Sequence, residues 1–239
     1  MSALADDKEA LARVVYEQCI DTKVAQIDKM VPKAAKAAGK AMKLLTHWKI
    51  DDVRGPSTTK DAAGKPIPGP IIEKGYDLGR PDSWDSNTVV VIDSFTHLGE
   101  ALMDYVLAAQ GRAGTQPYQS DWGEAIRMQT QIVQALIAPE FRANVIVISH
   151  ITYIGNELND KDLKAYPNAL GNKLPPKLGS WFNTIVHLKV SGTGDKTRRV
   201  LRTVSEGKLD LKSGDPKKIP AELPQETGLV EMFKILLGK

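Results

Sequence analysis

The stretch Thr88-Val-Val-Val-Ile-Asp93 says most about the fold of this chain. Its four consecutive β-branched apolar residues are typical of a strand that is buried on both faces, as in parallel sheets. A second run of this kind, Asn144-Val-Ile-Val-Ile-Ser149, follows further along the chain. Between the two runs, the apolar spacing predicts helices over residues 95–109 and 122–137. The order strand, helix, helix, strand predicts an α/β core with a mainly parallel sheet flanked by helices.

The segments on either side of this core have different patterns. Apolar residues recur at helical intervals between Leu11 and Val31, so a helical N-terminal appendage is expected over residues 1–50. Residues 51–87 are rich in Gly, Pro, Asp and Lys and lack periodicity, which indicates a flexible insertion or linker. The core is then expected over residues 88–239. Within it, the patterns predict a long loop over 151–179, a C-terminal β-hairpin over 182–204 and a short helix near 229–237.

The composition excludes several classes of protein. The chain has 239 residues, a formal net charge of +3 and a single cysteine, so an intrachain disulfide is impossible. Four scattered histidines without a CxxC or HExxH pattern argue against a dedicated zinc site. No apolar run approaches the roughly 20 residues that span a bilayer, and no basic-then-apolar leader is present at the amino terminus. We therefore expect a cytoplasmic protein without a membrane partner.

Polar residues end both predicted strands. Asp93 follows four apolar residues, and a carboxylate at the carboxyl end of a parallel strand can hold Mg²⁺ beside a triphosphate. The alternative is that Asp93 only caps the next helix. The second run ends in Ser149 and His150, and an imidazole there can donate to a γ-phosphate or orient the attacking water. The alternative is a histidine whose ring is bound by a local carbonyl.

Taken together, these motifs resemble a known family. The stretch Val89-Val-Val-Ile-Asp-Ser94 looks like the Walker B strand of RecA-like ATPases, and Val145-Ile-Val-Ile-Ser-His150 looks like their sensor strand. The stretches 179–183, 186–190 and 196–202 resemble the later RecA-like hairpin. The combination is most similar to phage-encoded, AAA-type P-loop ATP-binding recombination proteins, over residues 84–233. The resemblance implies a RecA-like P-loop NTPase core that uses ATP and Mg²⁺.

The resemblance also implies residue roles at the nucleotide. Asp93 would be the magnesium-associated carboxylate, Ser94 and Ser149 would lie beside the nucleotide, and His150 would sense the γ-phosphate. Arg199 and Arg202, with Arg198 beside them, would stabilise charge across a subunit interface, as an arginine finger does. The alternative for these arginines is a basic face on an exposed hairpin.

In RecA-like proteins, the loops after the Walker B region and after the sensor strand face single-stranded DNA. The matching segments here are 111–119 and 151–179. The candidate DNA-binding residues in them combine aromatic rings with cations, which suits base stacking beside a phosphate track: Arg112, Tyr118, Tyr153, Lys173 and Lys177. The alternative is that these are ordinary surface loops, in which Gly, Pro and Tyr are common.

The chain departs from the family at the phosphate-binding loop. No GxxxxGK[ST] motif occurs, and the segment around Lys23 has Glu17 and Thr22 where a P-loop needs glycines. In this fold the P-loop strand lies beside the sensor strand, so its absence would leave an apolar edge on residues 144–149. We expect this edge to be covered by the amino-terminal segment, by a partner polypeptide that carries the missing strand, or by another subunit of a homo-oligomer.

Three functions fit these observations. The first is an ATP-dependent protein of phage DNA recombination or replication, located in the host cytoplasm, whose P-loop is supplied elsewhere. The second is a non-hydrolysing scaffold of degenerate ATPase fold that binds DNA or protein. The third is a structural phage protein that uses the fold for assembly. Whether the chain is an enzyme stays open, because the Walker B motif is present and the Walker A motif is absent.

Overall fold

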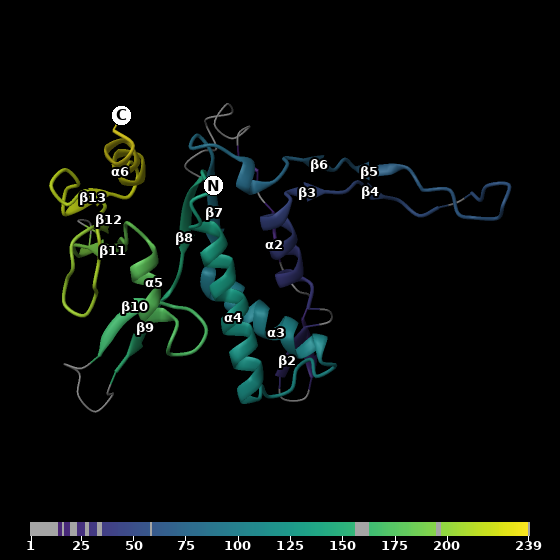
Figure 1. Ribbon diagram of the computed structural model, residues 1–239, viewed down its shortest axis with the longest axis horizontal. Helices are drawn as coiled ribbons and strands as arrows, with labels where there is room; N and C mark the ends of the chain where they lie inside the picture. Colours follow the sequence, from purple (N-terminus) through teal and green to yellow (C-terminus); the bar gives the residue numbers. More distant parts are fainter. Residues whose placement is uncertain are drawn as a thin grey trace. The chain divides into compact units, whose positions relative to one another are not determined.

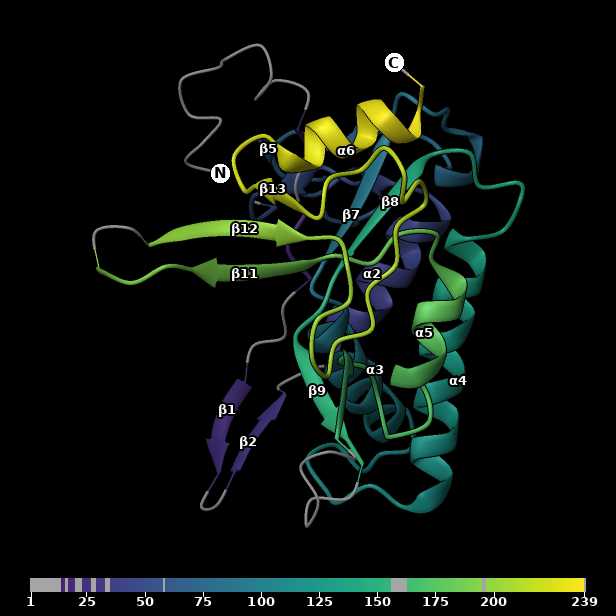
Figure 2. The ribbon, with the colours of Figure 1, turned by 90° about the vertical axis from the view of Figure 1, so that its left-hand side faces the viewer.

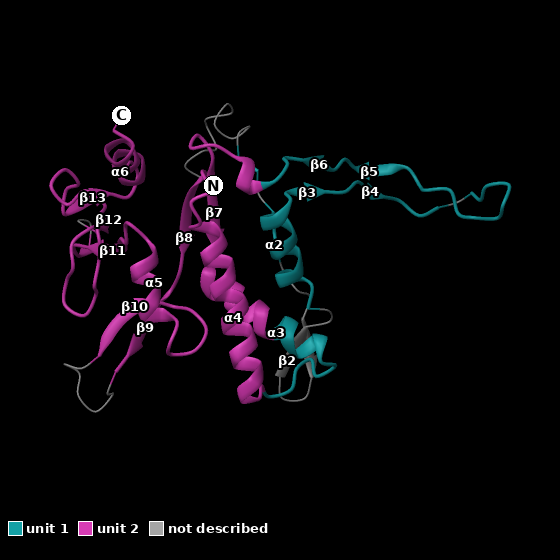
Figure 3. Cartoon of the chain, viewed as in Figure 1, with its two compact units in different colours: residues 1–80, 104–116 teal, residues 81–103, 117–239 magenta. Residues whose placement is uncertain are grey.

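The computed structural model describes residues 14–15, 17–19, 23–26, 29–32, 35–57, 59–155, 163–194 and 197–238. The chain is mixed α/β and divides into two compact units, shown in Figure 3. The first unit contains residues 1–80 and 104–116, and the second contains residues 81–103 and 117–239. Both apolar runs that decide the fold therefore belong to the second unit.

Two parallel strands form the centre of the second unit. Strand β7 (Val89–Asp93) pairs with β8 (Asn144–Ile148) in parallel, with Val89 opposite Asn144 and Asp93 opposite Ile148. Between them in the chain lie helices α3 (Phe95–Ala109) and α4 (Gln119–Leu136), close to the predicted ranges. The pairing of these two strands is thus as predicted. The larger parallel sheet is not formed by the described residues, because all their other strand pairs are antiparallel.

The pair of strands is buried only in part, and residues 144–147 of β8 are all half-buried. Val90 is buried on β7, together with apolar residues of the helices: Phe95, Leu98 and Leu102 of α3, and Ala125, Ile132, Val133 and Leu136 of α4. On the opposite face, Val89 and Val91 remain 47% and 51% exposed. The prediction of a strand buried on both faces is therefore wrong for β7. A run of β-branched residues gives the strand, but it does not show which face has a covering element.

The segment after β8 is more ordered than the long loop that we expected. Strands β9 (Ile151–Ile154) and β10 (Lys164–Pro167) pair antiparallel, with Thr152 opposite Tyr166. Helix α5 (Pro175–Trp181) follows and packs against β10. Short elements such as these carry too few residues to show a period in the sequence.

The C-terminal part forms a small antiparallel layer. Strands β11 (His187–Ser191), β12 (Arg198–Arg202) and β13 (Glu222–Pro224) make one sheet, and β11 and β12 lie side by side in Figure 2. This confirms the predicted hairpin. Helix α6 (Gly228–Leu236) packs against β13, near the predicted position. Leu201, Ile219, Leu223 and Met232 form the buried cluster that joins these elements.

The first unit begins with strands where a helix was predicted. Strands β1 (Lys23–Gln26) and β2 (Lys29–Pro32) pair antiparallel, with Val24 opposite Val31. The helical prediction is wrong for these residues, because the short hairpin gives both segments backbone partners despite their spacing of apolar residues. Helix α2 (Ala37–Thr46) follows and is the helical part of the predicted N-terminal segment within the described residues.

An antiparallel arm then extends from this unit, where a structureless linker was expected. Strand β3 (Lys49–Ile50) pairs with β6 (Tyr76–Asp77), and β4 (Val53–Arg54) pairs with β5 (Ile71–Glu73). These pairs form the thin hairpin labelled β3 to β6 in Figure 1, which turns at residues 61–65. Its strands are two or three residues long and mostly exposed, so the sequence carries no alternating pattern. The 3₁₀ helix η2 (Pro81–Ser83) precedes β7. None of the described helices is long and apolar enough to cross a membrane.

Candidate functional site

The register of β7 and β8 brings the predicted polar residues to one edge of the sheet. Because Asp93 lies opposite Ile148, the residues that follow the two strands leave the same end of the pair. We call Asp93, Ser94, His97, Ser149 and His150 the rim. Asp93, His97 and His150 are exposed, whereas Ser94 and Ser149 are half-buried.

Ser94, not Asp93, caps helix α3. The Ser94 hydroxyl accepts the backbone N–H of His97 at 3.3 Å, and the Ser94 carbonyl accepts the backbone N–H of Leu98 at 3.0 Å. Asp93 makes no side-chain hydrogen bond or ion pair with the described residues. Of the two roles considered for Asp93, helix capping is therefore taken by its neighbour. The carboxylate is left at the rim, where it can accept a metal ion.

The ring of His150 meets a second imidazole. The centroids of the His97 and His150 rings lie 5.4 Å apart, and the ring planes are nearly perpendicular at 81°. The Nδ1 atom of His97 is 2.8 Å from the Ser94 hydroxyl oxygen. Within the described part of the chain, the ring of His150 makes no hydrogen bond, so no local carbonyl binds it. Both imidazoles therefore keep ring nitrogens available to a ligand.

Thr96 fixes the backbone of the sensor segment. Its buried hydroxyl accepts the backbone N–H of His150 at 3.1 Å and lies 3.3 Å from the Ser149 hydroxyl. The Ser149 hydroxyl is 2.8 Å from the carbonyl of Asn168, and the N–H of Asn168 donates to the His150 carbonyl at 2.7 Å. The side chain of Ser149 is thus turned toward protein groups. The contact between Ser149 and a nucleotide, which the resemblance implies, stays a prediction.

A fully buried glutamine, Gln129, holds two segments that support the rim residues. The side-chain amide of Gln129 in α4 donates to the Phe95 carbonyl at 2.9 Å and accepts the Leu170 N–H at 2.9 Å. It therefore ties the start of α3 to the segment that carries Asn168. Gly99 allows this approach, since a Cβ at that position would lie 2.8 Å from the Gln129 amide nitrogen.

The arginines of the hairpin differ in their surroundings. Arg202 is bound by two carboxylates, with Nη1 at 2.6 Å from Glu222 and Nε at 3.3 Å from Glu206, and its side chain is only 20% exposed. Arg198 lies 3.6 Å from the other Glu222 oxygen. Arg199 is exposed and makes no ion pair with the described residues.

The candidate DNA-binding residues are divided between the two compact units. Arg112 lies in the turn after α3, within the first compact unit, and is half-buried. The other four belong to the second unit. Tyr118 precedes α4 and Tyr153 lies on β9, with exposures of 64% and 59%, while Lys173 and Lys177 are exposed before and within α5. Exposed rings and cations on the same unit are compatible with contact to a nucleic acid.

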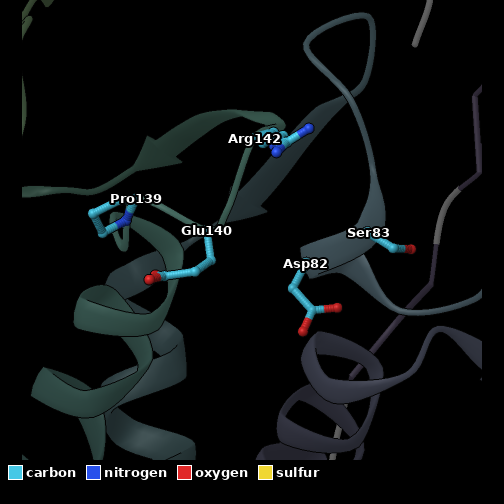
Figure 4. A pocket seen from close by; sticks show the side chains of 5 residues that line it. All are labelled: Asp82, Ser83, Pro139, Glu140 and Arg142. Atoms are coloured by element: carbon cyan, nitrogen blue, oxygen red, sulfur yellow. The ribbon is translucent and has the colours of Figure 1, made fainter.

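The second unit also has a polar pocket far from the rim along the strands. It has a volume of about 390 Å³ and is lined by Asp82, Ser83, Pro139, Glu140 and Arg142. Figure 4 shows these side chains, which come from η2 and from the link between α4 and β8. The pocket residues come before β7 and β8 in the chain, whereas the rim residues come after these strands, so the pocket and the rim lie at opposite ends of the strand pair. Two carboxylates and one guanidinium do not favour a phosphate, so the rim is the better candidate site.

Sequence reasoning missed three residues of the site. His97 lies three positions after Ser94, so it shares the first turn of α3 with it, and this spacing could have identified it. Thr96 and Gln129 are polar residues within apolar helical faces, which is a weaker signal. Their partners lie on other elements of the fold, and the sequence alone does not reveal these partners.

The rim suits part of a magnesium-nucleotide site. The exposed Asp93 carboxylate is the type of oxygen ligand that Mg²⁺ accepts, and the two imidazoles can donate to phosphate oxygens. Backbone N–H groups of a P-loop are missing, because the sequence lacks the motif. Among the described residues no three carboxylate, imidazole or thiol side chains gather to hold a metal ion, so Asp93 is the one carboxylate that the rim could offer to it. The rim also does not supply the cradle for the remaining phosphates.

Comparison with known proteins places the chain in a family. A family model described as an AAA domain matches residues 17–213, which is more than half of the chain. The chain therefore belongs to the AAA domain family, and its domain is of the nucleotide-binding, ATPase-like type, whose members generally use ATP and Mg²⁺. No curated protein and no solved structure gave a match.

Proposed function

We propose that this chain binds the triphosphate end of Mg·ATP at its rim, and that it works in phage DNA recombination or replication as a RecA-like protein. The observation that carries the nucleotide part is the register of β7 and β8, which delivers Asp93 and His150 to one edge. Membership of the AAA domain family supports the same ligand. The role in DNA metabolism rests on the resemblance of the strands and the hairpin.

In this proposal each rim residue has a separate role. Asp93 would hold Mg²⁺, whose charge would offset the repulsion between this carboxylate and the phosphates. His150 donates to the γ-phosphate. Ser94 and Ser149 position the two segments, and Arg199 reaches the nucleotide of a neighbouring subunit.

A P-loop must come from a segment that pairs with β8. Among the described residues β8 pairs with β7 alone, so its other edge has unpaired backbone groups. The half-exposed Val89 and Val91 lie on one face of the same sheet, where Val89 and Ile146 line an apolar pocket together with residues of α6. An open edge beside apolar side chains favours pairing with another strand. We propose that this strand belongs to a partner polypeptide or to another subunit of a homo-oligomer.

A binding titration tests the proposal. The full chain is titrated with fluorescent Mg·ATP, first alone and then with each candidate partner that carries a P-loop. We expect magnesium-dependent binding in at least one combination, and loss of the magnesium dependence in Asp93→Ala. The matched control is Asp210→Asn, an exposed carboxylate whose ion pair with Lys164 is 3.6 Å long. Absence of magnesium-dependent binding in every combination would exclude the nucleotide role.

The missing P-loop favours a second candidate, a non-hydrolysing scaffold that binds DNA or protein. The exposed Tyr153 and Lys177 support single-stranded DNA as its ligand. Binding to a labelled oligonucleotide is measured over a range of salt concentrations, without nucleotide. Tyr153→Ala should weaken binding by about tenfold if a base stacks on this ring, and Asp93→Ala should leave it unchanged. A loss of DNA binding in Asp93→Ala, with the fold retained, would instead favour the ATPase.

A further inference from the structure

The rim contains a second imidazole, that of His97, beside the proposed γ-phosphate sensor His150. His97 is exposed, its ring meets that of His150 at 5.4 Å between centroids, and it is anchored through Nδ1 to Ser94. The other two histidines of the chain lie elsewhere in the fold. His47 is bound to Asp77 in the first unit, and His187 lies on β11. Only His97 and His150 share a site at the end of the parallel strands.

The Ser94 hydroxyl is placed to select the tautomer of His97. Its oxygen accepts the backbone N–H of His97 at 3.3 Å and lies 2.8 Å from the Nδ1 atom of the same ring. A ring that accepts the hydroxyl proton at Nδ1 carries its own proton at Nε2. In that arrangement His97 has a donor at the outer end of its ring.

The spacing of the rings suits one phosphate group between them. A hydrogen bond from an imidazole to a phosphate oxygen is about 2.8 Å long, and a phosphate offers acceptor oxygens in several directions. Rings with centroids 5.4 Å apart can therefore donate to the same group.

We infer that His97 is a second phosphate-binding side chain of the rim, held as its Nε2–H tautomer by Ser94, and that with His150 it selects nucleoside triphosphate over diphosphate. This inference rests on the proposed nucleotide function. Asp93 would hold the metal at the strand end, and the two imidazoles, which follow the strand ends, would bind the terminal phosphate. A diphosphate lacks the group that both rings would bind.

The tautomer is tested first, without nucleotide. The chain labelled with ¹⁵N-histidine is studied by long-range ¹H–¹⁵N correlation, and its four ring systems are assigned with single His→Gln variants. We expect the Nε2–H form for His97 in the wild type, and a mixture of tautomers in Ser94→Ala. An Nδ1–H form of His97 in the wild type would overturn the inference whether or not the chain binds nucleotide.

The ligand role is tested by the affinities for Mg·ATP and Mg·ADP, in the combination of chains that binds nucleotide. His97→Ala should lower the preference for ATP over ADP by about tenfold, which is the change expected for one lost charge-assisted hydrogen bond. His97→Gln should keep most of the preference, because its amide nitrogen can replace Nε2, whereas His97→Asn should not. His187→Gln is the control that changes a histidine outside the rim.

The outcomes separate the two proposals. Nucleotide binding with an unchanged preference in His97→Ala would overturn the inference and leave the proposed function intact. An equal loss in the Gln, Asn and Ala variants would also overturn it, because it would show a structural role for the imidazole. If no nucleotide binds in any combination, the proposed function fails and the ligand role of His97 fails with it.

Discussion

Replacing Gln129 by Leu should destabilise the segments that support the rim without altering any rim residue. Gln129 is fully buried and joins the Phe95 carbonyl to the Leu170 N–H, with both hydrogen bonds at 2.9 Å. Leucine has nearly the same bulk, so the packing of α4 is retained while both polar partners are left without the amide. The substitution therefore tests the hydrogen bonds rather than the volume of the side chain.

The expected cost follows from the two groups left behind. The Leu170 N–H loses its partner in a buried position, which costs about 1–3 kcal/mol. The Phe95 carbonyl suffers less, because a carbonyl in the first turn of a helix also accepts from the N–H four residues later. Leucine recovers part of the loss through its apolar surface. We expect a net destabilisation of the second unit by about 2 kcal/mol, or close to a thirtyfold change in an equilibrium constant.

Amide hydrogen exchange measures this effect locally. In Gln129→Leu, the amides of Leu170 and Asn168 should exchange about thirty times faster if they open by local unfolding. Gln131→Leu, on an exposed position of the same helix, is the matched control and should change stability by less than about 0.5 kcal/mol. If Gln129→Leu exchanges like the wild type at both amides, Gln129 does not hold this segment and our account of the rim is wrong.

Three further predictions concern other parts of the chain. Partial burial raises the pKa of Glu17, but its hydrogen bonds with Lys40 and Tyr76 outweigh this effect and lower the pKa overall. The stability that Glu17 contributes is therefore present above its unfolded pKa and is lost as the pH falls through its folded pKa. In Glu17→Gln the loss of stability below about pH 4.5 should be smaller, as measured by acid titration followed by circular dichroism. Gly69→Ala should open the arm, because a Cβ there overlaps with the backbone of the opposite strand, and faster amide exchange confined to the arm would show it. Arg202→Gln should destabilise the C-terminal sheet by about 1–2 kcal/mol in urea unfolding, since Glu222 and Glu206 each lose one cation and keep only Arg198 and Lys189, whereas the exposed Arg199→Gln should have little effect.

The sequence predicts the parts of the fold whose patterns are long. The runs around Val90 and Ile146 predict β7 and β8, and the apolar spacing between them predicts α3 and α4. The arm was missed because strands such as β3, with two residues, are too short for an alternating pattern. The N-terminal prediction was wrong for β1 and β2, because helical spacing there competes with a local hairpin pairing that periodicity does not report.

The candidate site shows the same division. Asp93 and His150 were identified because each ends an apolar run, and the parallel register alone places them at one edge. Gln129 could not be found in this way, since its partners Phe95 and Leu170 are backbone groups of segments far from it in the chain. A buried polar side chain shows its importance only when the fold reveals which groups it satisfies.

The position of His97 follows partly from the sequence pattern and partly from the fold. A strand followed at once by a helix places the residue three positions after the helix cap at the same end of the sheet, so His97 follows from β7, Ser94 and α3 together. The neighbouring Thr96 holds the backbone of His150 at 3.1 Å, and therefore one helical turn both carries one imidazole and positions the other. Thr96→Val should then alter the ring contact of both histidines, while Ser94→Ala should alter the tautomer of His97 alone. Because the first turn of α3 carries the ring of His97 and holds the backbone of His150, a ligand that binds one ring should also shift the position of the other.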